Sequence, residues 1–395
     1  MPPLAISAFT ATTALGHGCA AQLEALLARR GGLRRNDFTA AAPLDTWIGR
    51  VGGIEDAPLP SRWARWECRN NRLAWLALEQ DGVLETIARL RHRHGPQRIA
   101  IIVGTSTASI GATEEAYARL DGDGAFPPDL RRPEVHTPHS LGGFVQEATD
   151  LHGPCVTVAT ACSSSAKVFA QAARLLATGM VDAALVGGVD TLCGSVLSGF
   201  NSLGLVSATP CRPFDLMRDG LSLGEAGSFA VLERTYPGGD ALQLRGHGES
   251  SDAHHMSAPH PQGLGARLAM ERALESASVD AAQVDYLNLH GTATPANDAV
   301  EAAAVAAMFP ASLHASSTKG WTGHTLGAAG IVESVFALLA LRHGLLPGTL
   351  NSADPDPACG PQIRFDNARR PLQLAMNNSF GFGGNNCSLL FGTPA

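Results

Sequence analysis

The sequence predicts an α/β protein, and three features of its 395 residues support that class. Short runs of aliphatic and β-branched residues are typical of buried strands. Ala-rich stretches with helical spacing separate these runs, which gives the alternation found in α/β folds. Glycines lie beside the apolar runs, where tight corners between strands and helices need them. The alternation favours buried sheets with mostly parallel strands.

The expected elements follow one another along the whole chain. A first strand and turn are expected within residues 1–20, and further strands at residues 98–104, 156–159, 183–189, 228–233, 241–246, 284–289 and 388–391. Helical spacing predicts helices at residues 162–178, 266–276, 299–308 and 326–342. The Pro- and Arg-containing segment 121–139 is expected to form a long surface loop.

Turn-forming residues divide the chain near its middle. The sequence Tyr-Pro-Gly-Gly-Asp at residues 236–240 stands between two expected strands, and Pro-Gly-Gly is strong turn punctuation. The patterns of elements before and after it are comparable. We therefore expect two similar α/β halves, residues 1–238 and residues 239–395.

Composition narrows the classes of function. The net charge of -7 argues against a general nucleic-acid-binding protein. The eight cysteines are scattered without a Cys-x-x-Cys pair, so neither a metal site nor a disulfide framework is expected. No basic segment resembling a signal peptide begins the chain, and we expect no apolar run of membrane-spanning length. A cytoplasmic location is therefore expected.

Cys162 is the first candidate for catalysis. It follows a buried strand and precedes an Ala-rich helix, within Thr-Ala-Cys-Ser-Ser-Ser. At a helix N-terminus, free N–H groups and the helix dipole favour a thiolate and can stabilise an oxyanion. The alternative is a buried structural cysteine, which is the commoner role of a single cysteine.

Two polar segments of the second half supply candidate partners for this nucleophile. His290 ends an expected strand, and the hydroxyls of Thr292 and Thr294 follow it. Lys319 and His324 flank a small-residue turn, and Glu333 lies on the helix that comes next. A core histidine or a surface lysine is the ordinary alternative at each position. A nucleotide-binding P-loop sequence is absent.

Phe380 and Phe382 lie in a glycine-rich turn near the end of the chain, Ser-Phe-Gly-Phe-Gly-Gly-Asn-Asn. A simple hairpin would explain this segment. The turn also fits a backbone N–H donor for a reacting carbonyl, with the two rings excluding water.

The order of these motifs resembles the β-ketoacyl-[acyl carrier protein] synthase family. The resemblance rests on the Cys162 elbow, His-Gly-Thr-Ala-Thr from His290, the segment from Lys319 through His324 to Gly-Ala-Ala-Gly, and Gly-Phe-Gly-Gly-Asn. Arg-Pro-Phe-Asp from Arg212 and Gly-Glu-Ala-Gly from Gly224 add the central signature of that family. The motifs are similar to the Cys-His-His class, which includes KAS I, KAS II and polyketide ketosynthases.

The resemblance implies a fold and a reaction. The fold is thiolase-like, with two similar halves and mixed sheets in a layered α-β-α-β-α arrangement, and it is usually dimeric. The reaction is the condensation of an acyl-enzyme thioester with malonyl carried on acyl carrier protein. No cofactor is implied, because decarboxylation drives the reaction.

The resemblance also implies roles for individual residues. Cys162 would carry the acyl group, and His290 and His324 would stabilise the enolate formed from malonyl. The N–H groups of Cys162 and Phe382 would form the oxyanion hole. The supporting residues implied are Lys319 held by Glu333, the hydroxyls of Thr292 and Thr294, and the pocket gate formed by Phe380 and Phe382.

Some positions depart from the family pattern. The first strand, Ser7 to Ala11, lacks the usual glycine turn, and Ala226 stands where glycine is commoner. Thr107 is polar at a position near the acyl pocket of relatives. We assign Thr107 and Phe200 to the acyl pocket, and the departures indicate a specialised synthase, for example for an aryl polyene or another polyketide.

An acidic acyl carrier protein is the implied partner, and the sequence offers arginines to receive it. Arg62, Arg65, Arg69 and Arg72 have helical spacing and can share one face, while Arg131 and Arg132 lie in the long loop. We predict carrier binding at Arg62, Arg65, Arg131 and Arg132 by charge attraction. A solvated arginine face without a partner is the alternative.

Three related functions compete with this interpretation. A chain-length-factor subunit of a heterodimeric ketosynthase would be catalytically weak, but such subunits lack the cysteine that this chain has. KAS III enzymes use Cys-His-Asn, whereas His324 fits the third position here. A thiolase needs a second cysteine near the glycine turn, and Cys387 lies beyond it. The chain is expected to form a homodimer or a ketosynthase heterodimer.

Overall fold

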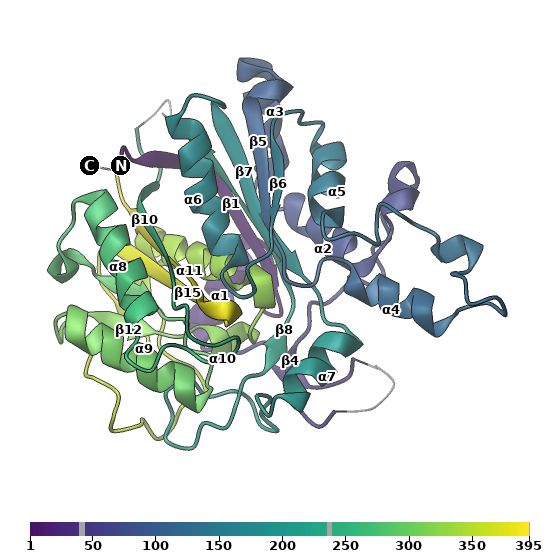
Figure 1. Cartoon of the computed structure of the whole chain (residues 1–395). Helices are drawn as coiled ribbons and strands as arrows, with labels where there is room; N and C mark the ends of the chain where they lie inside the picture. The colour runs from purple at the N-terminus through teal and green to yellow at the C-terminus, as the bar shows by residue number, and fades with distance from the viewer. Residues whose placement is uncertain (39–43, 235–238, 395) are drawn as a thin grey trace.

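Two repeated β-sheets form the frame of the protein (Figure 1), whose computed structural model describes residues 1–38, 44–234 and 239–394. The first sheet has the spatial order β6 (Cys155–Val158), β5 (Ile99–Gly104), β7 (Ala183–Asp190), β9 (Ala226–Glu233) and β1 (Leu4–Thr13). The second has the order β12 (His314–Ser316), β11 (Tyr286–Asn288), β15 (Leu374–Gly381), β16 (Asn385–Gly392) and β10 (Gln243–Ser251). If the five strands of each half are numbered along the chain, both sheets have the spatial order 3-2-4-5-1, so the two halves share one topology.

The strand directions differ from the expectation of mostly parallel sheets, which was wrong. Within these two sheets, as far as the structure describes them, parallel pairing is confined to β5 with β6 and β7, and to β11 with β12 and β15. β9, β1, β16 and β10 pair antiparallel with their neighbours, and an antiparallel β1–β10 contact joins the two sheets. Strands joined by a tight turn, as β15 and β16 are, must run antiparallel.

Two helices form a layer between the sheets. α6 (Ser164–Ala177) and α11 (Ala329–His343) each contact strands of both halves. Every residue of α11 from Ala329 to Leu341 is buried, as expected for a helix covered on both sides. α2 (Arg69–Leu78), α3 (Val83–His94) and α5 (Ser140–Thr149) cover the outer face of the first sheet, and α8 (Leu264–Ala277) covers the second, with α9 (Pro295–Met308) against α8. The predicted α-β-α-β-α layering is therefore confirmed.

The remaining elements are short or peripheral. They are α1 (Gly18–Ala28), α4 (Ile110–Ala118), α7 (Gly194–Ser202), α10 (Lys319–Thr322), the short strands β2 (Gly16–His17), β3 (Arg34–Arg35), β4 (Trp47–Gly49), β8 (Leu223–Gly224), β13 (Leu345–Leu346) and β14 (Ala368–Arg369), and the 3-10 turns η1 (Ser61–Trp66), η2 (Pro96–Arg98), η3 (Pro128–Leu130), η4 (Ala281–Gln283), η5 (Leu326–Ala328) and η6 (Phe382–Gly384). Residues 235–238, where the boundary between the halves was predicted, lie outside the described residues.

The central layer explains one further difference from the sequence analysis. Leu326–His343 has the length and apolar character of a membrane span, contrary to our expectation that no run would reach it. The segment is 89% buried inside the protein, so its apolar character reflects its place between two sheets.

Small residues bring the N-terminal ends of α6 and α11 together. A Cβ atom at Gly330 would lie 2.5 Å from the backbone nitrogen of Ala166, so only glycine permits this crossing. The Ser165 hydroxyl accepts a hydrogen bond from the Ile331 N–H at 3.0 Å. Residues just before the two helices are thereby placed next to each other.

Candidate active site

Cys162 lies at a tight turn between β6 and α6. Ala161, the residue before it, has a left-handed φ of 52°, which is strained for a residue other than glycine. The Ser164 hydroxyl accepts from the Thr160 N–H at 2.9 Å and donates to the Ala161 carbonyl at 2.6 Å. The serines after the cysteine therefore hold the turn that exposes the sulfur to the site.

His290 follows strand β11 and is held through its backbone. The Glu301 carboxylate, on α9, accepts from the N–H groups of His290 and Gly291, both at 2.8 Å. The Asn378 amide also donates to Glu301, at 3.2 Å. Burial raises the pKa of Glu301 to about 7, and the two N–H donors oppose that rise. Glu301 fixes the histidine, and the sequence analysis did not identify it.

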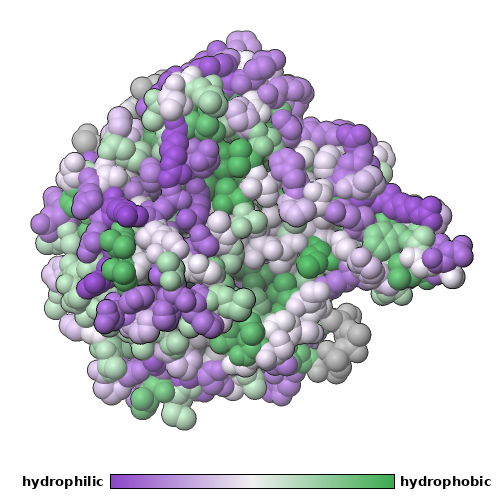
Figure 2. All heavy atoms as spheres, in the orientation of Figure 1, coloured by the Kyte–Doolittle hydropathy of each residue, from purple (hydrophilic) through white to green (hydrophobic). Residues whose placement is uncertain are grey.

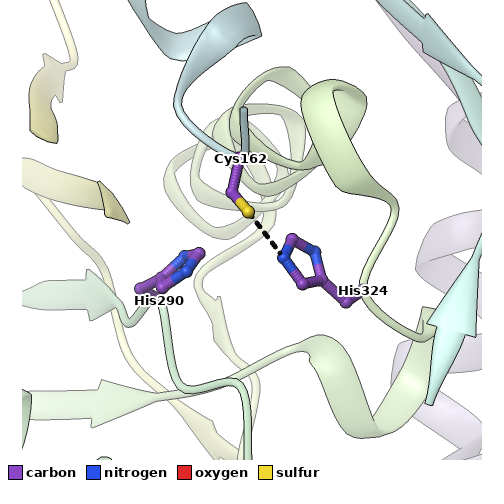
Figure 3. Close-up of side chains that lie close together, drawn as sticks. All are labelled: Cys162, His290 and His324. Carbon is purple, nitrogen blue, oxygen red and sulfur yellow. Dashed lines mark hydrogen bonds between the residues drawn. The ribbon is translucent and has the colours of Figure 1, made fainter. Parts of the chain in front are cut away.

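His324 comes from the loop between α10 and η5 and meets Cys162 across the two halves (Figure 3). Its Nε2 atom lies 3.0 Å from the Cys162 Sγ. The rings of His290 and His324 are 5.6 Å apart and nearly perpendicular. One ligand atom from each of Cys162, His290 and His324 lies within 4.8 Å of the others, and all three residues are buried. The predicted convergence of these three side chains is present in the structure.

Neighbouring donors set the tautomer of each histidine. The Leu326 N–H donates to Nδ1 of His324 at 3.3 Å, so its ring proton resides on Nε2. The Lys319 ammonium lies 3.4 Å from Nδ1 of His290, which places the ring proton of His290 on Nε2 as well. Burial, reinforced by the charge of Lys319, holds the pKa of both histidines well below the usual value. Both rings are therefore neutral donors at pH 7.

The same tautomers argue against a metal ion at this cluster. A metal bound through Nε2 requires a proton on Nδ1, and that proton needs an acceptor. Here the atoms facing Nδ1 are the Leu326 N–H and the Lys319 ammonium, which are both donors. The three side chains thus suit an oxygen atom of a substrate better than a cation.

The cysteine differs from the expectation of a thiolate. α6 begins at Ser164, two residues after Cys162, and burial raises the pKa of the Cys162 thiol to about 11. The Lys319 charge and the N–H groups of Phe382 and Cys162 lower this pKa in part. Burial therefore opposes the thiolate that the sequence predicted. The two N–H groups nevertheless lie beside the sulfur, where the carbonyl of an attached thioester would come.

Lys319 and Glu333 form a buried pair behind His290. The Lys319 ammonium donates to the Glu333 carboxylate, and the exposed fractions of the two side chains are 1% and 4%. Burial raises the pKa of Glu333 to about 7, against the effect of the Lys319 charge. The pairing proposed from the sequence is present, and it aims a cation at the imidazole.

A cavity of about 260 Å³ opens onto the cysteine. Its walls include eight residues predicted for the site, namely Cys162, Phe200, His290, Thr292, Thr294, His324, Phe380 and Phe382. The rings of Phe200 and Phe382 stack with centroids 5.7 Å apart, and the Phe380 ring lies 5.9 Å from His290. A larger groove of about 830 Å³, between α2, α4 and α7, contains none of the catalytic side chains.

Thr107 lies away from this cavity. Its hydroxyl donates to the buried Asp190 carboxylate at 2.5 Å, and the residue lines a separate pocket between β5 and α4. The β5 strand ends at Gly104, and the loop after it wraps around Asp190, which directs Thr107 away from the sulfur. The structure therefore gives Thr107 no contact with the cavity at Cys162.

The arginines predicted to bind a carrier do not form one helical face. Arg62 and Arg65 lie on η1, and the extended Cys68 separates them from α2, which begins at Arg69. Arg65 pairs with Glu147, and the guanidinium of Arg62 lies over the Trp63 ring at 4.2 Å.

The other arginines of this region are also tied to the protein. Arg131 lies 3.8 Å from Asp121, and Arg132 donates to the Glu67 carbonyl at 2.6 Å. Arg69 and Arg72 point inward to glutamates.

Comparisons with known proteins point to one family. The Beta-ketoacyl synthase N-terminal domain model matches residues 68–237, and the Beta-ketoacyl synthase C-terminal domain model matches residues 242–353. Nodulation protein E of Rhizobium meliloti (strain 1021) is 35% identical over 304 residues, covering 74% of this chain and 75% of that protein. The chain belongs to the β-ketoacyl synthase family.

Two further proteins are similar to this β-ketoacyl synthase. The mitochondrial 3-oxoacyl-[acyl-carrier-protein] synthase of Arabidopsis thaliana is 40% identical over 275 residues, which span 63% of this chain but only 58% of that protein. The ketosynthase ApeO of Xenorhabdus doucetiae, solved with its chain length factor ApeC, superposes with a TM-score of 0.90 at 34% identity, covering 99% of this chain and 98% of that one. The thiolase-like fold predicted from the motifs is confirmed by this likeness.

Proposed function

We propose that this β-ketoacyl synthase is an acyltransferase that performs a decarboxylative Claisen condensation. It joins an acyl group on Cys162 to malonyl carried on acyl carrier protein, and it releases a β-ketoacyl thioester. The observation that carries the proposal is the meeting of one sulfur with two imidazole Nε2 donors in a buried cavity. The Arabidopsis relative, a 3-oxoacyl-[acyl-carrier-protein] synthase, supports the same reaction and the same carrier.

The first step transfers the acyl group. The Cys162 sulfur attacks the carbonyl of the incoming thioester, and the N–H groups of Cys162 and Phe382 stabilise the oxyanion. The carrier sulfur then leaves with the proton of the Cys162 thiol. Because the thiol pKa is raised to about 11, this proton transfer must accompany the exchange of the two sulfurs.

The second step forms the carbon–carbon bond. When CO₂ leaves malonyl, the electron pair of the broken bond becomes an enolate on the thioester, and its oxygen accepts from the two Nε2–H groups of His290 and His324. The carbanion attacks the acyl carbonyl, and the bond from that carbon to Cys162 Sγ breaks, which leaves a thiolate that takes up a proton from solvent. Neutral histidines suit the decarboxylation because it needs donors to the enolate oxygen and no proton transfer from the rings.

The departures from the family pattern support a specialised pathway, and we propose fatty-acid, polyketide or aryl-polyene biosynthesis as its setting. The similarity to a ketosynthase solved with a chain length factor supports the polyketide branch. Phe200 is proposed as a wall of the acyl pocket because it stacks on Phe382 inside the cavity. We retain Thr107 only as a proposed specificity position at the neighbouring pocket.

A dimer is proposed as the working unit, either of two copies or with a chain-length-factor-like partner. Among the described strands, β6 is the last of its sheet and is only partly buried, so its free edge can receive another strand. The α4 segment projects from the body, and Figure 2 shows hydrophobic residues in this region. On α4, Ile110 is 40% and Tyr117 is 64% exposed. We also propose two halves divided at residue 238 and a cytoplasmic location, which the eight free cysteines support.

Intact-mass analysis tests the proposed reaction. The purified chain is incubated with a panel of acyl carrier proteins, and stoichiometric acylation that disappears in Cys162→Ser is expected. Addition of malonyl carrier should then release CO₂ and a β-ketoacyl carrier product. Acylation without extension, with or without a partner chain, would instead identify a catalytically weak subunit.

A further inference from the structure

Two features noted in the sequence are unexplained by the active-site chemistry: the Gly-Glu-Ala-Gly motif and Arg69. The carboxylate in that motif, on Glu225, is fully buried. It accepts from Arg69 Nη2 at 2.6 Å and Nε at 3.0 Å. It also accepts from the N–H groups of Val51 at 3.0 Å and Leu192 at 3.1 Å. Four donors thus hold one carboxylate, and Arg69 supplies the only positive charge among them.

The residues just before Glu225 hold the backbone of His324. The His324 N–H donates to the Ser222 carbonyl at 2.7 Å, and the His324 carbonyl accepts from the Gly224 N–H at 2.9 Å. His324 therefore lies beside β8 as an extra strand residue. On the other side of β8 lies β4, which runs parallel to it, and the Gly49 carbonyl accepts from the Glu225 N–H at 2.9 Å.

The backbones of β8, β4 and the loop before His324 lie so close together that one cannot move without the others. A Cβ atom at Gly224 would lie 2.4 Å from the Thr322 carbonyl oxygen, and one at Gly49 would lie 1.8 Å from it. The loop itself is irregular, since Gly323 has a φ of 74° and Leu326 a φ of 56°. In the part of the chain that the structure describes, both backbone hydrogen bonds of His324 go to Ser222 and Gly224, so β8 takes part in setting where the His324 backbone lies.

We propose that Arg69 and Glu225 are positioning residues for His324, which act through β8 and set the distance from its Nε2 atom to the Cys162 sulfur. The inference rests on the proposed condensation and adds two residues outside the cavity to it. Without Arg69, the buried carboxylate of Glu225 loses its charge partner, so it takes up a proton or moves toward solvent, and either change disturbs the hydrogen bonds that hold it. Glu225 is covalently continuous with Gly224, so this disturbance is passed to His324 through two backbone hydrogen bonds.

The geometry separates this role from carrier binding. The Arg69 side chain is 20% exposed, and its Nε, Nη1 and Nη2 atoms all donate to Glu225 or Glu55. Because these atoms already donate to glutamates of the same chain, the guanidinium has few donors free for an acidic partner. Arg72, three residues later on α2, has the same charge but pairs with Glu67 instead. Arg72 is therefore a matched control.

Steady-state condensation kinetics test the proposal with Arg69→Met and Arg72→Met. Arg69→Met is expected to lower kcat by about ten- to hundredfold with little change in the KM for malonyl carrier. A misplaced catalytic group stabilises the transition state less well but does not affect the docking of the carrier. Arg69→Lys keeps the charge but loses the bidentate geometry, so it should recover part of the rate. Arg72→Met should keep kcat within about twofold of the parent.

Imidazole ¹⁵N NMR distinguishes a local effect on His324 from a general loss of stability, which would not shift the resonance of one histidine alone. Arg69→Met should shift the Nε2 resonance of His324 and leave that of His290 in place, because Glu301 holds His290 independently. If Arg69→Met does not fold, Glu225→Gln takes its place with the same expected results, because its amide nitrogen would face the Arg69 and backbone N–H donors that the lost oxygen accepted.

Unchanged kcat with a raised, salt-sensitive KM in Arg69→Met would overturn the proposal and make Arg69 a docking residue. Equal shifts of both histidines, or equal loss in Arg72→Met, would overturn it too. A parent protein that does not condense at all would instead refute the proposed function, so the two failures can be told apart.

Discussion

Gly330→Ala should separate the two central helices and misplace the catalytic groups at their ends. The new Cβ would lie 2.5 Å from the Ala166 nitrogen, which is about 0.9 Å short of the 3.4 Å at which ordinary contact begins. The obstructing atoms are the backbone nitrogen, Cα and Cβ of Ala166, and none of them can rotate away. Overpacking of this kind destabilises by about 1–3 kcal/mol, and a displacement near 1 Å at a catalytic pair can lower the rate by about a hundredfold.

Urea unfolding and the condensation rate measure the two effects separately. Gly199→Ala is the matched control, because Gly199 lies in helix α7 and its Cβ would meet nothing within 4 Å. This variant should gain about 0.5–1 kcal/mol and keep its activity. A Gly330→Ala protein with the stability and rate of the parent would show that the helix crossing does not set the distance from Cys162 to His324.

Three further outcomes are expected. Lys319→Met should destabilise the fold by about 3 kcal/mol, because it leaves Glu333 buried without a cation; adding Glu333→Gln should restore unfolding stability in urea but not the condensation rate. Burial raises the Glu301 pKa from 4.5 to about 7, so the folded state binds this proton more tightly, and the free energy of unfolding should fall by about 3 kcal/mol as pH rises across that window. In urea titrations, the free energy of unfolding of Glu301→Gln should depend less steeply on pH. A pH dependence equal to that of the parent would refute the assignment. Arg65→Glu should raise the KM for acyl carrier protein and weaken its salt dependence, and unchanged carrier affinity would remove Arg65 from the docking surface.

Local patterns in the sequence predicted most of the regular elements. The apolar runs that became β5, β7 and β9 and the Ala-rich stretches that became α6, α8, α9 and α11 are close to their expected positions. β12 has only three residues, and β15 carries the buried polar residues Asn377, Asn378 and Ser379. Neither has the continuous apolar run by which strands are recognised, so no range was predicted for either, although a hairpin at the glycine-rich turn was considered for β15.

The sequence by itself determined the chemical groups of this β-ketoacyl synthase and the order in which they occur, because each motif is local and its residue types limit what it can do. Only the tertiary structure decided how these groups act. It raised the thiol pKa of Cys162 by burial, oriented both imidazoles through Leu326 and Lys319, and turned Arg69 inward to Glu225. The desolvation of Cys162 and the pairing of Arg69 with Glu225 depend on segments more than a hundred residues apart, which no single stretch of sequence contains. The contact of Lys319 with His290 likewise joins two separate motifs.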